Sequence, residues 1–79
     1  MKTVYVLGTG CARCNRLHEV VSQACHDSAN PCRVEKVTDF MRFPDFGVMV
    51  TPALVIDGVI RASGRVPSTA EVTQWLAEP

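Results

Sequence analysis

Apolar and polar positions along this chain repeat in ways that predict strands and amphipathic helices in turn. Residues 3–7 are β-branched, aromatic and almost continuously apolar, as is typical of a strand buried on both faces. From Leu17 the apolar residues recur with helical spacing, which predicts a helix over residues 12–28 that stops before Pro31. Residues 32–37 predict a second strand. Because a helix connects the two strands, they should be parallel.

The residues after the second strand predict a short helix. Thr38 or Asp39 can cap it through a side-chain oxygen, and the helix would run to about Phe46. Pro44 lies inside this segment and weakens the prediction, since proline removes a backbone donor. The apolar side chains expected to join the core here, or in part to form an exposed docking rim, are Phe40, Met41, Phe43 and Phe46.

The last third of the chain predicts a β-hairpin followed by a helix. Asp57-Gly58 separates the strand-like runs 53–56 and 59–63, and this dipeptide is a strong signal for a tight hairpin turn. An amphipathic pattern over residues 70–77 predicts the final helix. The expected element order is therefore β-α-β-α-β-β-α.

Composition limits the class of protein. Seventy-nine residues, of which 47% are hydrophobic, are expected to form one domain over residues 1–79. The eight basic and eight acidic residues cancel and are scattered, so we expect neither nucleic acid nor a membrane as a partner. The sequence shows no signal-peptide pattern and no apolar stretch near the roughly 20 residues of a membrane helix, so a cytoplasmic protein is expected. Structural disulfides are rare in that compartment, and the four cysteines call for another role.

The stretch from Gly8 to Cys14, GTGCARC, lies where the first strand becomes the first helix. Gly8 and Gly10 allow the backbone to turn tightly there. Cys11 and Cys14 are separated by two residues, so they can close a reversible disulfide. They can also bind a soft metal ion through two thiolates. Both chemistries are consistent with this stretch.

Three motifs in order resemble the thioredoxin/glutaredoxin superfamily, most closely its small bacterial and archaeal redox-active disulfide proteins. They are the CxxC stretch, the segment Gly47–Gly58 with its Thr51-Pro52 pair, and the segment Gly64–Ser68. The resemblance implies an α/β thioredoxin-like fold, with a four-stranded mixed sheet and helices on both faces. It also implies a cis peptide bond before Pro52 that faces the CxxC.

The resemblance implies different roles for the two cysteines. Cys11, at the start of the helix, would be the nucleophile, because the helix N-terminus favours a thiolate. Cys14, one turn further along, would resolve the mixed disulfide by forming the redox disulfide Cys11–Cys14. Gly10 would tune the site through the turn, and Arg13 would do so through its positive charge.

Further site residues come from the same resemblance. Thr51 and Pro52 are candidate docking residues for an extended peptide, although Pro52 could instead simply begin an edge strand. Gly64-Arg65 lies where glutaredoxins hold glutathione, but the usual paired glycines and aspartate are missing, which argues against glutathione binding. Tyr5 replaces the buried carboxylate of thioredoxins, and it either tunes the site or is a core aromatic with its hydroxyl at the rim.

The other cysteines and the two histidines receive no catalytic role. Cys25 and Cys32 fall on inward faces and are expected to pack as small hydrophobes, although a disulfide between them is geometrically conceivable. His18 and His26 are expected to face solvent.

The leading hypothesis is a thiol–disulfide oxidoreductase that reduces protein disulfides. An upstream disulfide reductase would reset it, and no bound cofactor or metal is required. The alternatives are a metallochaperone that uses the same CxxC, a structural zinc site, and a redox sensor or adaptor without turnover. Metallochaperone domains of this kind end in a strand, whereas this chain ends in a predicted helix with Trp75 and contains Thr51-Pro52. These differences favour the oxidoreductase.

Overall fold

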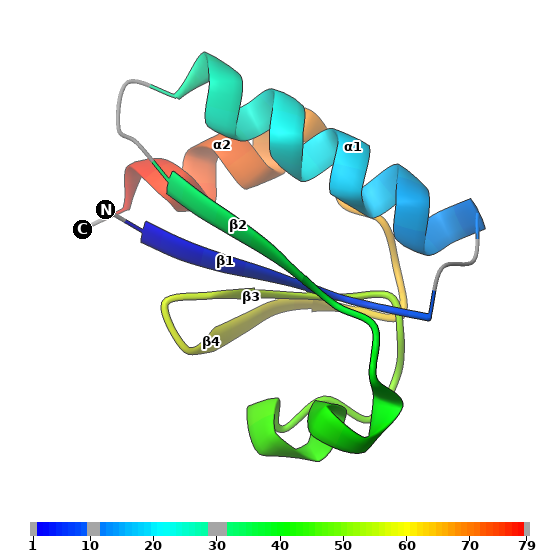
Figure 1. The fold of residues 1–79 in the computed structure, drawn as a ribbon. Helices are drawn as coiled ribbons and strands as arrows, with labels where there is room; N and C mark the ends of the chain where they lie inside the picture. Colours follow the sequence, from blue (N-terminus) through cyan, green and yellow to red (C-terminus); the bar gives the residue numbers. More distant parts are fainter. Residues whose placement is uncertain (1, 10–11, 29–31, 79) are drawn as a thin grey trace.

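Strands and helices follow one another in the order that the sequence predicts. The computed structural model describes residues 2–9, 12–28 and 32–78 (Figure 1). The boundaries of the predicted strands and long helices are correct to within one residue. The elements are β1 (Lys2–Leu7), α1 (Ala12–Asp27), β2 (Cys32–Val37), the 3-10 helix η1 (Phe40–Phe46), β3 (Ala53–Ile56), β4 (Val59–Ser63) and α2 (Thr69–Ala77).

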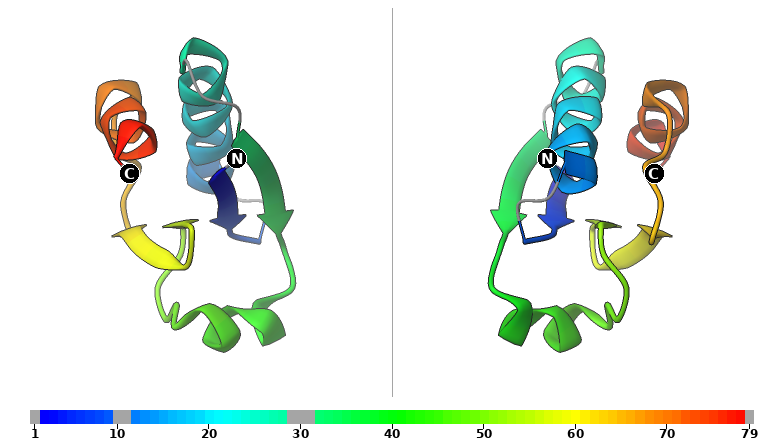
Figure 2. Two further views of the ribbon diagram at one scale, coloured as in Figure 1. Left: turned by 90° about the vertical axis from the view of Figure 1, so that its left-hand side faces the viewer. Right: turned by 90° about the vertical axis from the view of Figure 1, so that its right-hand side faces the viewer.

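The described strands form one four-stranded mixed sheet in the order β2-β1-β3-β4. β1 runs parallel to β2 and antiparallel to β3, and β3 pairs antiparallel with β4. Helices α1 and α2 lie together on one face of the sheet, and η1 lies on the other (Figures 1 and 2). The predicted mixed sheet with helices on both faces is confirmed.

The hydrophobic core is divided by the sheet into two clusters. Strand β3 contributes to both, because successive side chains of a strand point to opposite faces. The main cluster, under α1 and α2, contains Val4, Val6, Leu17, Val20, Val21, Ala24, Leu54, Ile56, Ala62, Val72 and Leu76. The second cluster, under η1, contains Leu7, Val37, Phe43, Val48, Ala53 and Val55.

The short predicted helix is η1, and it has 3-10 geometry. Asp39 caps it, with a side-chain oxygen accepting from the Met41 N–H at 3.0 Å. Pro44 inside the segment has no N–H to donate, which is unfavourable for a continuing α-helix. Gly47 ends the helix with φ 77°, a left-handed conformation that glycine adopts without steric cost.

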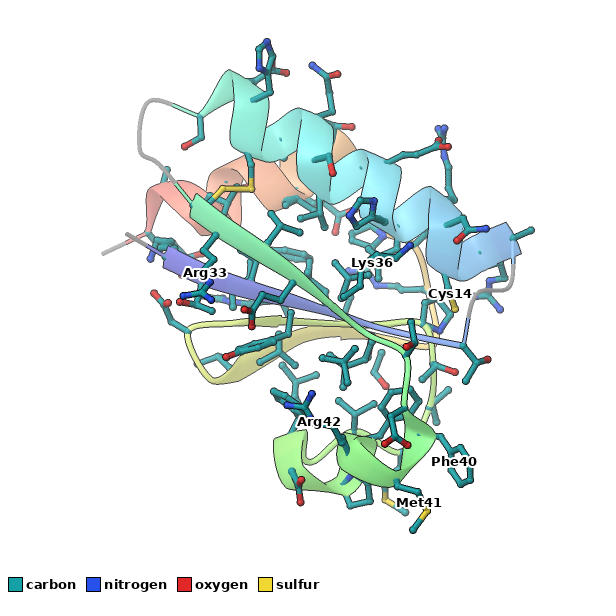
Figure 3. All side chains as sticks on the ribbon, viewed as in Figure 1. Cys14, Arg33, Lys36, Phe40, Met41 and Arg42 are labelled. Atoms are coloured by element: carbon teal, nitrogen blue, oxygen red, sulfur yellow. A yellow bond between two sulfur atoms is a disulfide. The ribbon has the colours of Figure 1, made fainter. Side chains whose placement is uncertain are left out.

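Only half of the apolar side chains of η1 are core residues. Phe43 is buried, and Phe46 packs partly buried against the second cluster. Phe40 and Met41 are 64% and 70% exposed, so the expectation that they join the core is wrong. In Figure 3 the Met41 side chain projects from η1 away from the sheet, whereas the Phe40 side chain extends sideways from the start of η1.

The predicted hairpin is present, and its turn is attached to the first strand. Asp57 and Gly58 have φ of 49° and 83°, as a tight turn between β3 and β4 requires. The Asp57 N–H donates to the Thr3 carbonyl, and the Thr3 N–H donates to the Asp57 carboxylate, both at 2.9 Å. The Lys2 ammonium lies 3.5 Å from the same carboxylate. The Thr3 N–H above all, and then Lys2, lower the pKa of Asp57 below its usual value.

This geometry predicts an acid-dependent loss of stability. Because folding lowers the pKa of Asp57, its ionised form stabilises the fold above the unfolded-state pKa, and this contribution is lost as pH falls below about 3.8. We expect Asp57→Asn, which keeps the acceptor oxygen, to flatten the decline in thermal midpoint between about pH 5 and about pH 2. Asp45→Asn, at an exposed position on η1, is the control and should follow the wild type. Equal slopes for wild type and Asp57→Asn would contradict the assignment.

Cys25 and Cys32 are joined by a disulfide, so the expectation that they pack as separate small hydrophobes is wrong. The last part of α1 and the first residue of β2 bring their Cα atoms to 6.0 Å, a separation that a disulfide spans. Both side chains still pack, partly buried, against the main cluster. Hydrophobic periodicity predicts that Cys25 lies on the inward face of its helix and Cys32 on the inward face of its strand. Only the packing of α1 against β2 in the folded chain brings the two residues together.

Candidate functional site

Cys14 lies in the first turn of α1 and is 5% exposed, close to the end of β1 (Figure 3). Gly8 leaves the room that this thiol occupies. A Cβ added at Gly8 would lie 2.2 Å from the Cys14 Sγ and 2.7 Å from its Cβ. The Gly8 N–H also donates to the Val37 carbonyl at 3.0 Å, which holds the turn to the end of β2. The other predicted members of this site, Gly10 and Cys11, lie outside the described residues.

Arg13 connects the start of α1 to Gly64, which directly follows β4. Its guanidinium donates to the Gly64 carbonyl, and the Gly64 N–H donates to the Pro52 carbonyl at 2.8 Å. Pro52 is fully buried, and the Thr51–Pro52 peptide bond is cis. Two residues that the sequence assigns to the site from distant segments, Arg13 and Pro52, are thus linked through Gly64.

Gly64 is suited to this link by its lack of a side chain. Its φ is 77°, and an added Cβ would lie 3.0 Å from a methyl carbon of Val50. The Ser63 hydroxyl donates to the Val50 carbonyl at 3.1 Å, so the end of β4 is bonded to the same loop. The backbone around Pro52 is therefore held from β4 as well as from α1.

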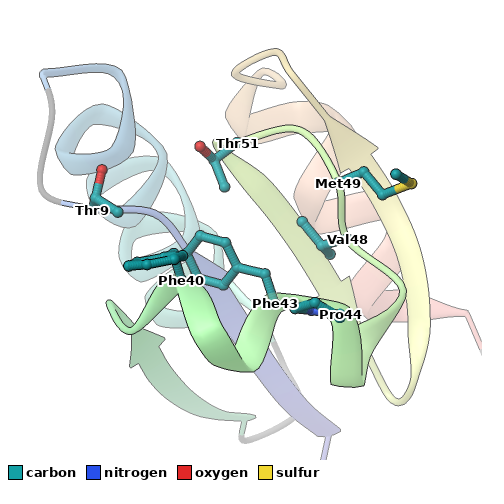
Figure 4. Close-up of a pocket in the computed structure, with 7 residues that line it drawn as sticks. All are labelled: Thr9, Phe40, Phe43, Pro44, Val48, Met49 and Thr51. Atoms are coloured by element: carbon teal, nitrogen blue, oxygen red, sulfur yellow. The ribbon is translucent and has the colours of Figure 1, made fainter.

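An apolar groove of about 420 Å³ opens between the end of β1, η1 and the loop before β3 (Figure 4). Phe40 and Phe43 face it from η1, and Thr9 and Thr51 stand on its opposite walls with their hydroxyl groups. Most of the lining is therefore apolar, and Thr9 and Thr51 contribute hydroxyl groups to it. The lining residues are Thr9, Phe40, Phe43, Pro44, Val48, Met49 and Thr51.

Sequence reasoning gave no site role to four of the groove residues, Thr9, Pro44, Val48 and Met49. Met49 is 94% exposed, although the apolar residues around it in the sequence suggest that it leads into a buried strand. The usable signal was its position two residues before Thr51-Pro52, in a stretch that contributes no strand residue until Ala53. Exposed large apolar side chains beside a predicted docking residue indicate a contact surface.

Tyr5 lies on the face of the sheet that η1 covers. Its ring packs against Phe46, with 4.9 Å between ring centroids and 53° between planes. Val4 and Val6, on either side of it in β1, belong to the main cluster under α1. Cys14 belongs to α1, which covers that other face. The Tyr5 ring and Cys14 therefore lie on opposite sides of the sheet.

Arg65 acts at the start of α2. Its guanidinium lies 3.0 Å from the Glu71 carboxylate, which also accepts from the Ser68 N–H at 3.2 Å. Arg65 first, and then the Ser68 N–H, lower the pKa of Glu71 below its usual value. The Ser68 hydroxyl accepts from the Glu71 N–H in return, which completes a capping box. Arg65 is thus bonded within the α2 cap.

The described residues contain neither a cluster of metal-ligating side chains nor a membrane-spanning helix. Residues 2–9, 12–28 and 32–78 contain no group of three or more His, Cys, Asp or Glu side chains that could hold a metal ion. His18 is half-buried on α1, and His26 is exposed near its end. In the same part of the chain, no helix has the length and apolarity needed to cross a membrane.

The architecture defines the class of protein. A mixed sheet in the order β2-β1-β3-β4, with a CxxC at the start of α1 and a cis-proline before β3, is the thioredoxin-like α/β fold. Comparison with known families agrees, since a family model described as a thioredoxin domain matches residues 2–77. The chain belongs to the thioredoxin family.

Two archaeal proteins are similar to the chain over nearly all of its length. A thioredoxin of Methanocaldococcus jannaschii is 34% identical over 76 residues, which cover 96% of this chain and 87% of that protein. A thioredoxin of Methanothermobacter thermautotrophicus is 29% identical over 77 residues, which cover 98% of this chain and all of that protein.

The Arg13 link predicts a specific effect on activity. In Arg13→Gln the hydrogen bond to Gly64 is lost, so the loop around Pro52 is less firmly positioned against α1. We expect the rate of thiol–disulfide exchange to fall about two- to tenfold, as loss of a net 0.5–1.5 kcal/mol would give. Arg16→Gln removes the same charge from the exposed side of α1, where Arg16 pairs only locally with Glu19 at 3.6 Å, and it should leave the rate unchanged. Equal losses in both variants would indicate an effect of charge alone.

Proposed function

We propose that this chain is a thiol–disulfide oxidoreductase that reduces protein disulfides through the Cys11–Cys14 dithiol. The observation that carries the proposal is the position of Cys14. Its thiol is buried in the first turn of α1, in space that only glycine at position 8 leaves open. Arg13, the residue before it, donates to the Gly64 carbonyl, and the Gly64 N–H donates to the Pro52 carbonyl. Membership of the thioredoxin family supports thiol–disulfide exchange as the chemistry.

The proposed reaction transfers two electrons to the substrate. The Cys11 thiolate attacks one sulfur of the substrate disulfide, and the other substrate sulfur leaves as a thiolate that takes up a proton. Cys14 then loses its proton and attacks the Cys11 sulfur, which releases the second substrate thiol. The products are a reduced substrate and a Cys11–Cys14 disulfide, and a disulfide reductase returns the protein to its dithiol form. The residues supply this chemistry without a bound cofactor.

We propose that substrates bind in an extended conformation along the apolar groove. Thr51 lines the groove next to Pro52, and its backbone can pair with an extended segment beside the substrate disulfide. Apolar side chains of that segment would then contact Phe40 and Met49. We place this reaction in the cytoplasm, where a reductase can keep the dithiol reduced.

The groove assignment predicts an effect at one η1 side chain and none at its neighbour. Phe40→Ala removes an exposed aromatic side chain from the groove, so we expect KM for a protein disulfide to rise roughly fivefold at similar kcat. Met41→Ala is the matched control, because Met41 is equally exposed but does not line the groove. Steady-state reduction of insulin at varied insulin concentration measures both constants. The same KM in wild type and Phe40→Ala would remove Phe40 from the docking surface.

The test of the proposed function is insulin-disulfide reduction with dithiothreitol as reductant, run beside Cu(I) and Zn(II) titrations of the reduced protein. We expect the wild-type chain to accelerate insulin reduction over dithiothreitol alone. Tight binding of one metal ion without any acceleration would instead support the metallochaperone alternative. Neither acceleration nor metal binding, with intact redox cycling of the CxxC, would support a sensor or adaptor.

A further inference from the structure

A second pair of cysteines lies at the other end of α1. Cys25, near the end of that helix, is bonded to Cys32, the first residue of β2, with a sequence separation of 7 (Figure 3). The bond therefore ties the end of α1 directly to an edge strand of the sheet. Neither cysteine takes part in the proposed reaction at the CxxC.

Cys14 lies too far from Cys25 for the two to exchange directly within one chain. Cys14 and Cys25 are separated by eleven residues of α1. At a rise of 1.5 Å per residue, this is about 16 Å along the helix axis. Thiol–disulfide exchange requires direct contact between sulfur atoms, so the Cys25–Cys32 bond must react with a thiol from outside the chain.

We propose that Cys25–Cys32 is a second thiol–disulfide exchange site, whose reaction partner is a dithiol and whose state sets the stability of the α1–β2 end of the fold. Both side chains are only partly buried, so an attacking thiolate can approach the bond in the folded protein. They pack on the periphery of the main cluster, where thiols pack as small hydrophobic groups just as a disulfide does. Opening the bond would thus leave a folded chain with a less constrained α1–β2 connection.

Exchange at Cys25–Cys32 takes place in two steps. A thiolate of the external dithiol attacks one of the two sulfur atoms, the Cys25–Cys32 bond breaks, and a mixed disulfide forms. The second thiol of the reagent then displaces the remaining protein sulfur. Cys25 and Cys32 end as thiols with the two protons of the dithiol, and the reagent ends as a cyclic disulfide. Two electrons pass from the dithiol to the protein.

Reduction should change stability by a measurable amount. A cross-link lowers the entropy of the unfolded chain, and for a loop as short as this one the expected effect on the unfolding equilibrium constant is roughly fiftyfold. A longer loop would give a larger factor, so the short loop makes the bond a modest stabiliser.

The experiment uses the full chain with Cys11→Ser and Cys14→Ser, which removes the CxxC chemistry and makes the result independent of the proposed function. This variant is equilibrated in graded mixtures of reduced and oxidised dithiothreitol without denaturant, and thiols are counted by alkylation and mass. We expect a single two-electron transition confined to Cys25 and Cys32. Urea unfolding, followed through the sole tryptophan, Trp75, should show about a fiftyfold larger unfolding constant for the reduced form.

A matched control adds Cys25→Ala and Cys32→Ala to the same background, and its unfolding should not respond to the redox mixture. If the CxxC variant does not fold, peptide mapping of alkylated Cys25 and Cys32 in the wild-type chain gives the same titration. The proposal is overturned if two free thiols persist under oxidising conditions. It is also overturned if the bond is reduced only after denaturation, or if both redox forms unfold at the same urea concentration.

Discussion

Replacing Cys14 with serine is expected to trap a mixed disulfide between Cys11 and the substrate. The serine hydroxyl cannot displace the substrate thiol, so the reaction stops after the first exchange. Turnover in insulin reduction should fall by about a thousandfold or more, as is usual when one member of a catalytic unit is removed. The covalent complex should be visible as an intact-mass adduct that dithiothreitol reverses. Peptide mapping should locate the adduct at Cys11.

The Cys11→Ser variant should lose the same turnover without any adduct, because the nucleophile itself is missing. Accumulation of a mixed disulfide at Cys14 in this variant would reverse the assigned roles. Cys25→Ala combined with Cys32→Ala is the control for the number of thiols, and at a temperature where it is folded it should reduce insulin at the wild-type rate. A large loss in the control would place the second pair in the reaction.

Substituting Gly8 with alanine is expected to damage both the site and the fold. The new Cβ would lie 2.2 Å from the Cys14 Sγ, a distance that no pair of nonbonded atoms sustains, so the start of α1 or the end of β1 must move. Overpacking of this kind typically costs about 1–3 kcal/mol. Because the displaced atom is the proposed resolving sulfur, we expect insulin reduction to fall by more than tenfold even where the variant is fully folded. Urea unfolding and steady-state kinetics measure the two effects separately.

Gly58→Ala separates this steric effect from the general effect of adding a side chain to a glycine. Gly58 has a positive φ, at 83°, and no atom lies within 4 Å of an added Cβ. We expect it to destabilise the protein by about 1–2 kcal/mol through backbone strain and to leave the rate of insulin reduction unchanged. If Gly8→Ala keeps the wild-type rate as well, the Cys14 thiol is not held where the proposed resolution step needs it.

The proposed reaction also needs a group that accepts the Cys14 proton. Thioredoxins carry a carboxylate for this purpose at the position of Tyr5, and this chain has no acidic residue before Glu19. The Tyr5 ring lies against Phe46 on the face of the sheet away from α1, so it has a packing partner of its own. Water is then the proposed acceptor, and resolution should be slower than attack.

The sequence by itself determined the order of the elements and most of their boundaries. The signals involved are local: the apolar run of β1, the helical spacing that begins at Leu17, and Asp57-Gly58 between two strand-like runs. A strand or helix of this kind depends mainly on residues within one or two turns of itself, so pattern and turn chemistry are sufficient. The CxxC and Thr51-Pro52 could be singled out for the same reason, because each is a short contiguous motif.

Only the tertiary structure decided which distant residues meet. The Cys25–Cys32 bond and the Arg13–Gly64–Pro52 link join residues from separate elements, and no local pattern encodes these contacts. Exposure of Phe40 depended on which side of η1 packs on the sheet, which its sequence of mostly apolar residues leaves undetermined. The groove and the space at Gly8 likewise arise where β1, η1 and α1 converge. The sequence was therefore sufficient to identify the candidate site residues, whereas tertiary packing determined which residues surround them.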